Sequence, residues 1–336
     1  MQKFDSFLYS SGFSKMARPF APFLGHILMI HRVVEPDGKP RLPENQLYEI
    51  TPAILKNTIR FFRDRKYVFK SLDAMVDGIQ TGEKLEKFVC VTFDDGYTDT
   101  CTTAYNILKE EGIPFCIYIT TDFPDRKAAF WWNMLEESLL VSDEMRFSLD
   151  GKEHRIPCAA FQQKRDAFRT ICRLVLNSEN GISAAWKAVF EPLGLDRTTW
   201  VERLAMSWEQ INQLGRDPLV TIGAHTCSHP SLAGLTEEEA LYEIRDSRAI
   251  IREKTGLKVE HFAYPYGSTL DVTDREARLA ASLGFKTAVT TNRGNVYRYH
   301  RKRLMLLPRI NVSPIRTMEE LTLAADGCIP QTFFRF

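Results

Sequence analysis

Residues 88–93 have the sequence FVCVTF and lead directly into Asp94, Asp95 and Gly96. This short run, rich in β-branched and aromatic residues, predicts a buried strand. Neighbouring side chains of a regular strand face opposite ways, but Gly96 permits a tight turn that would let both carboxylates reach one site. The alternative is a turn with two solvated acids, because Asp-Asp-Gly is ordinary turn composition.

Strand-like and helix-like segments alternate on either side of this stretch. The expected strands cover residues 27–30, 88–93, 115–119, 219–224, 262–264, 287–290 and 305–309, and the expected helices cover 54–65, 103–111, 236–254 and 273–283. Parallel strands need crossovers of helix length, so the alternation predicts an α/β fold with a parallel sheet. About seven strands favour a closed or nearly closed barrel, in which chemistry collects where the strands end.

Residues 123–206 interrupt this alternation. They contain helical patterns at 131–140, 161–176 and 183–190, and a hairpin signal at Asp150-Gly151. We expect a mainly helical insertion between two strands of a barrel domain, residues 25–336, which follows an N-terminal segment, residues 1–24. Because the insertion leaves the barrel after a strand, where barrel loops reach the active site, it should cover the catalytic face.

The composition is that of an ordinary globular protein. The chain has 336 residues, 26% of them charged, and a formal net charge of +1, which argues against broad electrostatic capture of nucleic acid. The seven cysteines are scattered singly without CxxC spacing, so they give neither a disulfide framework nor a cysteine zinc site. A reducing compartment is the simpler interpretation.

The first thirty residues partly match the pattern of a secretory signal peptide. No apolar run in the chain reaches the ~18 residues that suggest a membrane span. The apolar stretch 20–30 is interrupted by a proline and a histidine and does not end in small residues, which favours a loop followed by a buried strand. Phe4, Phe7 and Leu8 lie at helical spacing, and we expect this stripe to pack on the protein body, with peripheral membrane contact as the alternative.

A pair of histidines follows the predicted strand 219–224. His225 and His229 are four residues apart, a spacing that can place two imidazoles on one side of a helical turn and let them bind one metal ion. Cys227 lies between them but would point elsewhere. The alternative is a polar loop with two surface histidines, although the chain has only seven histidines and close pairing by chance is uncommon.

Two further strand ends carry candidate residues. The segment Tyr264–Gly267 ends a predicted strand in a turn fixed by proline and glycine, and His31 ends the first strand. An aromatic turn and a structural histidine are the alternatives. Both positions fall at the edge of the barrel where the other candidates are expected.

Together these residues resemble the polysaccharide deacetylase family, also called the NodB-homology or carbohydrate esterase family 4 enzymes. Thr92–Gly96 is similar to the first motif of the family, His225–His229 to its second motif, His-(Ser/Thr)-x-x-His, and Pro265–Gly267 to its third. The resemblance covers roughly residues 25–336 apart from the insertion.

The resemblance implies a distorted (β/α) barrel and a set of roles. Asp95, His225 and His229 would bind one divalent metal ion, Zn²⁺ in the first place, with Co²⁺, Ni²⁺ or Mn²⁺ as alternatives. Asp94 would be the catalytic base. Two imidazoles and one carboxylate leave positions open on such an ion, as in catalytic sites. The metal and the backbone N–H of Tyr266 would hold the oxyanion.

The sequence departs from the family pattern at two places. The family's third motif often begins with an arginine that orients the base, but Ala263 stands here. The last motif often supplies a histidine as general acid, which the segment 307–310 lacks. Arg309 could replace the arginine and His31 the acid, although Ile30 departs from the tyrosine that precedes this histidine in related deacetylases.

The resemblance implies an N-acetylated glycan as substrate. With no secretion signal recognised, we expect a cytoplasmic enzyme that deacetylates a sugar of a surface polysaccharide or of its lipid- or nucleotide-linked precursor. A small amide or imide, or a peptidoglycan sugar, is the alternative substrate, and an inactive glycan-binding homologue is the non-enzyme alternative. Trp131, Trp132, Pro265 and Tyr266 could contact the sugar, although adjacent tryptophans point different ways on a helix and at least one should be core.

Overall fold

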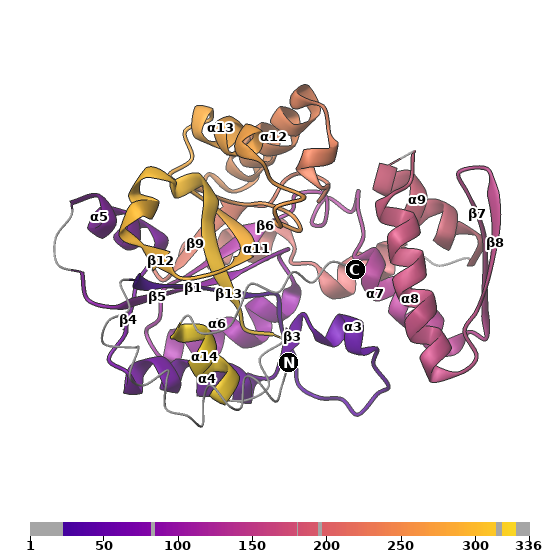
Figure 1. Cartoon of the computed structure of the whole chain (residues 1–336), viewed down its shortest axis with the longest axis horizontal. Helices are drawn as coiled ribbons and strands as arrows, with labels where there is room; N and C mark the ends of the chain where they lie inside the picture. The colour runs from indigo at the N-terminus through magenta and orange to yellow at the C-terminus, as the bar shows by residue number, and fades with distance from the viewer. Residues whose placement is uncertain (1–22, 82–84, 180, 194–196, 314–317, 327–336) are drawn as a thin grey trace.

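A closed barrel of seven parallel strands forms the body of the protein (Figure 1). The computed structural model describes residues 23–81, 85–179, 181–193, 197–313 and 318–326. Around the barrel the order is β1 (Phe23–Ile30), β13 (Leu307–Asn311), β11 (Thr287–Arg293), β10 (His261–Ala263), β9 (Val220–Ala224), β6 (Phe115–Ile119) and β5 (Phe88–Phe93). In-register pairing of β1 with β5 closes the ring. The predicted α/β barrel of about seven strands is confirmed.

Short strands extend the barrel at its seam. β12 (Val296–Tyr297) pairs antiparallel with β1, and β4 (Val68–Phe69) pairs parallel with β5. β2 (Arg32–Val33) and β3 (Glu49–Ile50) form a separate parallel ladder just after β1. None of these two-residue strands has enough length to show a pattern in the sequence.

Helices surround the barrel. They are α4 (Pro52–Asp64), α5 (Leu72–Thr81), α6 (Tyr105–Glu110), α11 (Trp208–Leu214), α12 (Glu237–Thr255), α13 (Asp274–Ser282) and α14 (Met318–Ala325). The predicted start at Thr51 is present, since its side chain accepts the N–H of Ile54. Thr236 and Glu239 form the expected capping box. The helix expected over 103–111 begins instead as a π-helical turn, Thr100–Ala104.

Strand alternation separates two apolar layers. Along β5, Val89, Val91 and Phe93 pack outward under the helices, whereas Phe88 and Cys90 belong to an inner cluster. That inner cluster also contains residues of α5. The alternation therefore carries Thr92 and Asp94 toward the barrel interior at the end of the strand.

The segment between β6 and β9 lies beside the barrel (Figure 1). Its elements are α7 (Trp131–Val141), β7 (Glu144–Leu149), β8 (Lys152–Pro157), α8 (Phe161–Leu176), α9 (Gly181–Phe190), a 3₁₀ turn (Glu191–Leu193) and α10 (Arg197–Leu204). It has its own apolar cluster, which includes Phe168, Trp186 and Phe190. Asp150 and Gly151 both have positive φ, 50° and 71°, as a two-residue hairpin turn requires.

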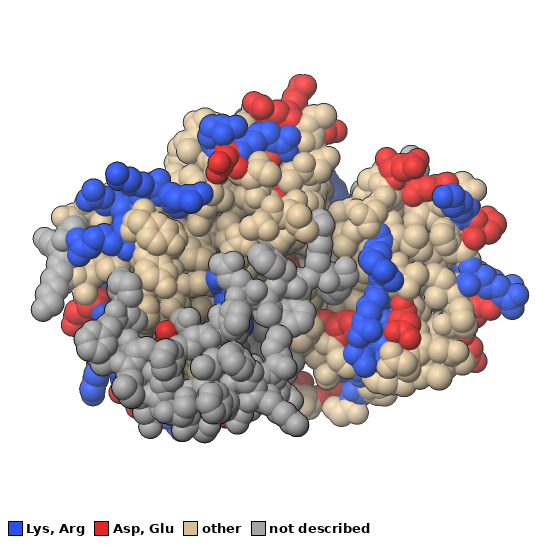
Figure 2. All heavy atoms as spheres, in the orientation of Figure 1, with Lys and Arg blue, Asp and Glu red and all other residues tan. Residues whose placement is uncertain are grey.

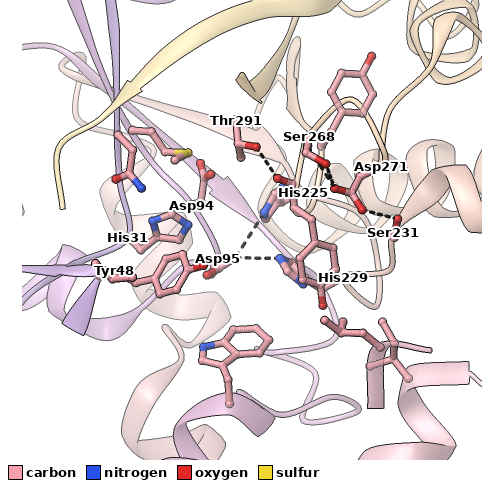
Figure 3. A pocket seen from close by; sticks show the side chains of 18 of the residues that line it. His31, Tyr48, Asp94, Asp95, His225, His229, Ser231, Ser268, Asp271 and Thr291 are labelled. Atoms are coloured by element: carbon pink, nitrogen blue, oxygen red, sulfur yellow. Dashed lines mark hydrogen bonds and ion pairs between the residues drawn. The ribbon is translucent and has the colours of Figure 1, made fainter. Parts of the chain in front are cut away.

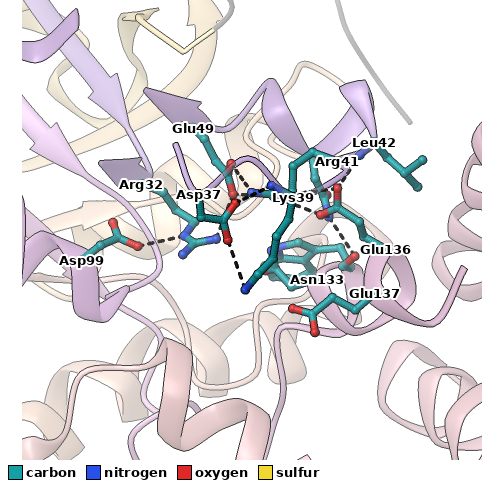
Figure 4. Close-up of polar contacts among 12 residues, drawn as sticks. Arg32, Asp37, Lys39, Arg41, Leu42, Glu49, Asp99, Asn133, Glu136 and Glu137 are labelled. Carbon is teal, nitrogen blue, oxygen red and sulfur yellow. Dashed lines mark hydrogen bonds and ion pairs between the residues drawn. The ribbon is translucent and has the colours of Figure 1, made fainter. Parts of the chain in front are cut away.

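Ion pairs join this insertion to the loop after β1 (Figure 4). Arg32 bonds to Asp99 and to Glu49, at 2.8 Å each. Arg41 bridges Glu49, at 2.6 Å, and Glu136 of α7, at 3.0 Å. Because Glu136 is only 2% exposed, the chain of charges ties α7 firmly to the barrel.

The structure describes neither residues 1–22 nor residues 327–336. Of the predicted N-terminal segment 1–24, residues 1–22 lie outside the described residues, and Phe23 already belongs to β1. Across the described ranges, no helix combines the length and the apolar character needed to cross a membrane. The domain limits expected from the sequence remain a prediction.

Candidate active site

A cavity of about 380 Å³ opens at the carboxyl ends of the barrel strands. The barrel contributes His31, Asp94, Asp95, His225, His229, Tyr266 and Asp271, among others. The insertion contributes Trp131, Trp132, Arg173, Leu176, Asn177 and Ile182. The volume lies in the range of small-ligand sites, and candidate residues from separate motifs thus share one cavity (Figure 3).

Three candidate metal ligands converge in this cavity. Asp95, His225 and His229 offer ligand atoms that all lie within 4.8 Å of one another. Asp95 Oδ1 is 3.4 Å from His225 Nε2 and 3.3 Å from His229 Nε2, as the dashed lines in Figure 3 show. Asp95 also has a positive φ of 71°, which turns its carboxylate back toward the site that Asp94 reaches by strand alternation.

The segment 225–229 is a loop and not the helical turn suggested by its spacing. Thr226 and His229 have positive φ, 67° and 63°. Glu243 of α12 holds the loop by accepting the N–H groups of Cys227, at 2.7 Å, and Ser228, at 3.0 Å. Cys227 Sγ faces the backbone carbonyl of Glu243, so the thiol points away from the ligands, as expected.

The donor set fits a metal ion. His225 Nδ1 lies 2.7 Å from the carbonyl oxygen of Ala263. A donated Nδ1–H fixes the tautomer that leaves Nε2 free as a ligand. Asp95 Oδ1 is buried and has no hydrogen-bond donor among the described residues. Burial alone would raise the pKa of Asp95, but the two histidines hold it well below its usual value.

Asp94 forms a buried two-pronged pair with Arg309 of β13. Arg309 Nη1 and Nη2 each lie 2.7 Å from an oxygen of Asp94, and both residues are at most 2% exposed. Arg309 Nε also donates to the carbonyl of Thr290, at 2.9 Å. The expected contact is present. Burial opposes ionisation, but the guanidinium keeps the pKa of Asp94 below its usual value.

His31 lies at the end of β1, beside Asp94 and Asp95 in Figure 3. Its ring meets the ring of Tyr48 edge to face at 5.1 Å. Its Nδ1 is buried without a hydrogen-bond partner in the described part of the chain. Burial lowers the pKa of His31, and the two neighbouring carboxylates act in the opposite direction.

The four residues expected to contact substrate differ in burial and in whether they line the cavity. Tyr266 lines the cavity, has a positive φ of 58° and packs 4.9 Å from the ring of His229. Trp132 is half-buried and its ring lies 5.4 Å from that of His229. Trp131 lines the cavity but is 4% exposed and packs in the insertion core. Pro265 is buried and is not part of the cavity lining.

Several cavity residues escaped the sequence analysis. Tyr48 lines the site from the loop before β3. Asp271 accepts hydrogen bonds from Ser231 and Ser268, which ties the loop of His229 to the turn of Tyr266. Ser231, Ser268 and Asp271 lie close to motif residues in the sequence, which is the signal that they offered, whereas Tyr48 offered none.

Comparisons with known proteins agree with this arrangement. Residues 81–147 and 152–288, more than half of the chain, match a family model described as polysaccharide deacetylase. Chitin deacetylase 1 of Cryptococcus neoformans var. grubii is 35% identical over 71 residues, which span 21% of this chain and 14% of that protein.

Solved structures of low identity share the fold. The Streptococcus pyogenes deacetylase PplD, in complex with acetate, has a TM-score of 0.58 at 18% identity, over 90% of this chain and 99% of that one. IcaB from Ammonifex degensii has a TM-score of 0.55 at 18% identity, over 91% and 98%. The fold and site define a (β/α)-barrel protein with its polar groups at the strand ends. The chain belongs to the polysaccharide deacetylase family, a family of hydrolases that act on amide bonds.

Proposed function

We propose that the protein is a metal-dependent N-deacetylase of an N-acetylated sugar, in a surface polysaccharide or in its lipid- or nucleotide-linked precursor. One observation carries the proposal: a three-residue ligand set and a buried, arginine-paired carboxylate meet in one cavity. Membership of the family supports the amide bond as the target and an acetylated glycan as the substrate.

Asp95, His225 and His229 would hold one divalent ion, Zn²⁺ or alternatively Co²⁺, Ni²⁺ or Mn²⁺. Three protein ligands of this kind leave positions open for reactants. When bound, such an ion supplies Lewis acidity, which polarises an amide carbonyl and lowers the pKa of water.

Asp94 is the proposed base. Each carboxylate oxygen has about two acceptor positions, so an oxygen bonded to Arg309 retains one for the proton of the attacking water. The guanidinium fixes the plane of the carboxylate and keeps it charged. Tyr266 would support the developing oxyanion through its backbone N–H.

His31 is the proposed proton donor to the departing amine. It lines the same cavity as Asp94 and Asp95, outside the set of metal ligands. Only the protonated ring can donate in this step. The two carboxylates favour protonation and thereby oppose the effect of burial.

A cytoplasmic location, with a precursor as substrate, belongs to the same proposal. Cys90, Cys101, Cys116, Cys158, Cys172 and Cys227 are all free thiols. Free cysteines in this number suit a reducing compartment, where lipid- or nucleotide-linked sugars are assembled.

The test measures acetate released from N-acetylated glycans by the metal-loaded protein, by the chelator-treated protein and after metal is restored. We expect release to stop on chelation and to return with Zn²⁺. His225→Ala should lose both metal and activity, whereas His154→Ala, in the hairpin, should keep both. Glycan binding without acetate release would favour the inactive homologue instead.

A further inference from the structure

Three arginines lie on one face of α8, and only two of them pair with a carboxylate of the described residues. Arg165, Arg169 and Arg173 are spaced four apart and so share one face of the helix. Figure 2 shows Lys and Arg atoms in a line over α8, on its side toward the barrel. Arg165 and Arg169 pair with Glu44, at 3.1 Å and 2.6 Å.

Arg173, the last of the three, lines the catalytic cavity. It is exposed, and no carboxylate of the described residues lies within ion-pair distance of it. Its Nε makes only a long contact, 3.4 Å, with the carbonyl of Arg169. Because a guanidinium carries five N–H donors, most of its donor capacity is not used by the described residues.

No carboxylate among the described residues of the cavity lining is free to neutralise the positive charge of Arg173. The carboxylates in the lining are Asp94, Asp95 and Asp271. The first is paired with Arg309, the second belongs to the ligand set, and the third accepts hydrogen bonds from two serines. Beside Arg173 the insertion offers only neutral side chains, Leu176, Asn177 and Ile182.

We propose that Arg173 is a specificity-determining residue that binds an anionic group, a phosphate or a carboxylate, attached to the acetylated sugar. This inference rests on the proposed function, because it places the sugar between the reacting groups and the insertion. The planar fork of an arginine matches both anions. A sugar phosphate and a uronate-containing glycan are the two sources of that chemistry.

The test compares N-acetylglucosamine 1-phosphate, an N-acetylglucosamine–glucuronate disaccharide and neutral di-N-acetylchitobiose as substrates. For the preferred charged substrate, Arg173→Gln should raise KM about twofold to fivefold, more than for the neutral one, and Arg173→Lys should recover part of the loss. The preference should shrink as salt rises. Arg146→Gln removes the same charge from the hairpin, away from the cavity, and should leave the preference intact. The charged substrate that responds identifies the anion.

Calorimetric binding of the same three compounds separates this inference from the proposed function. Absence of acetate release from all three would count against the proposed activity. Tighter binding of a charged compound, weakened about twofold to fivefold by Arg173→Gln, would still support the anion site. Equal affinity for charged and neutral compounds, or equal effects of Arg173→Gln and Arg146→Gln, would overturn it.

Discussion

At the scale of single residues, the site depends on two adjacent acids that reach it by different routes. Asp94 continues the inward alternation of β5, and Asp95 enters through a left-handed backbone conformation. Thr226, His229 and Tyr266 have the same conformation. For a residue other than glycine it costs roughly 1–2 kcal/mol, so the surrounding packing must hold this cluster of strained residues at the cavity edge.

Asp94→Asn should lower turnover by at least about 100-fold. The amide nearly matches the carboxylate in size and keeps one oxygen for Arg309, but it cannot take a proton from water. Metal content and thermal unfolding of the purified variant would show that site and fold are retained. If such a variant kept near-normal turnover, Asp94 would not be the base.

His31→Ala should also reduce turnover by about 100-fold while the metal content stays the same. The expected loss follows from the position of His31 in the cavity, outside the ligand set. The measurement is kcat beside metal analysis, with His154→Ala as the matched histidine control. Unchanged kinetics would show that His31 is not the proton donor, and Tyr48, which lines the same cavity, would be the next residue to test.

At the scale of elements, the strands were predictable because their apolar runs are bounded by turn residues. β5 and β6 have the predicted bounds, and β13 starts two residues late. Arg309 was also within reach of sequence reasoning, because Ala263 replaces the arginine usual in the family and Arg309 stands in the segment similar to its last motif. The roles of Glu243 and Asp271 could not be predicted from the sequence, because they depend on how α12 and the loops pack.

Glu243 supports the histidine loop from outside the ligand set. Its carboxylate accepts two backbone N–H groups and the hydroxyl of Ser228, at 2.6 Å. Glu243→Gln keeps the size but loses the charge and turns one acceptor into a donor. We expect metal affinity to fall about 10-fold to 100-fold, as for other groups that orient ligands.

Metal affinity of the Glu243→Gln variant can be measured by competition with a chelator. Glu238→Gln, on the exposed first turn of the same helix, removes the same charge and should bind metal normally. Equal affinity in the two variants would show that the loop does not need the Glu243 carboxylate.

At the scale of the whole molecule, one network fixes the insertion over the barrel edge. Glu136 of α7 accepts the N–H of Leu42, at 2.5 Å, and bonds to Arg41 and Asn45 (Figure 4). A buried charge of this kind is costly unless it is fully paired, so α7 has little freedom to move away. The insertion thereby becomes a fixed wall of the catalytic cavity.

Substitutions of Trp131 and Trp132 in α7 should therefore have different effects, the first on folding stability and the second on substrate selection. Trp131 is 4% exposed within the insertion core, so Trp131→Ala should cost about 3–5 kcal/mol of folding free energy. Trp132 is half-buried in the cavity wall, and its Nε1 donates to the hydroxyl of Tyr97, at 2.8 Å. A flat aromatic face there suits the apolar face of a sugar ring.

Trp132→Ala should impair deacetylation of an extended acetylated glycan more than that of a minimal acetylated sugar, because only the extended chain reaches along the insertion. Trp132→Phe keeps an aromatic face and should retain more of the preference. The readout is the ratio of kcat/KM for the two substrates, after thermal unfolding has shown that each variant is folded. Equal losses on both substrates would mean that Trp132 shapes the site near His229, and that the insertion does not select the glycan through this residue.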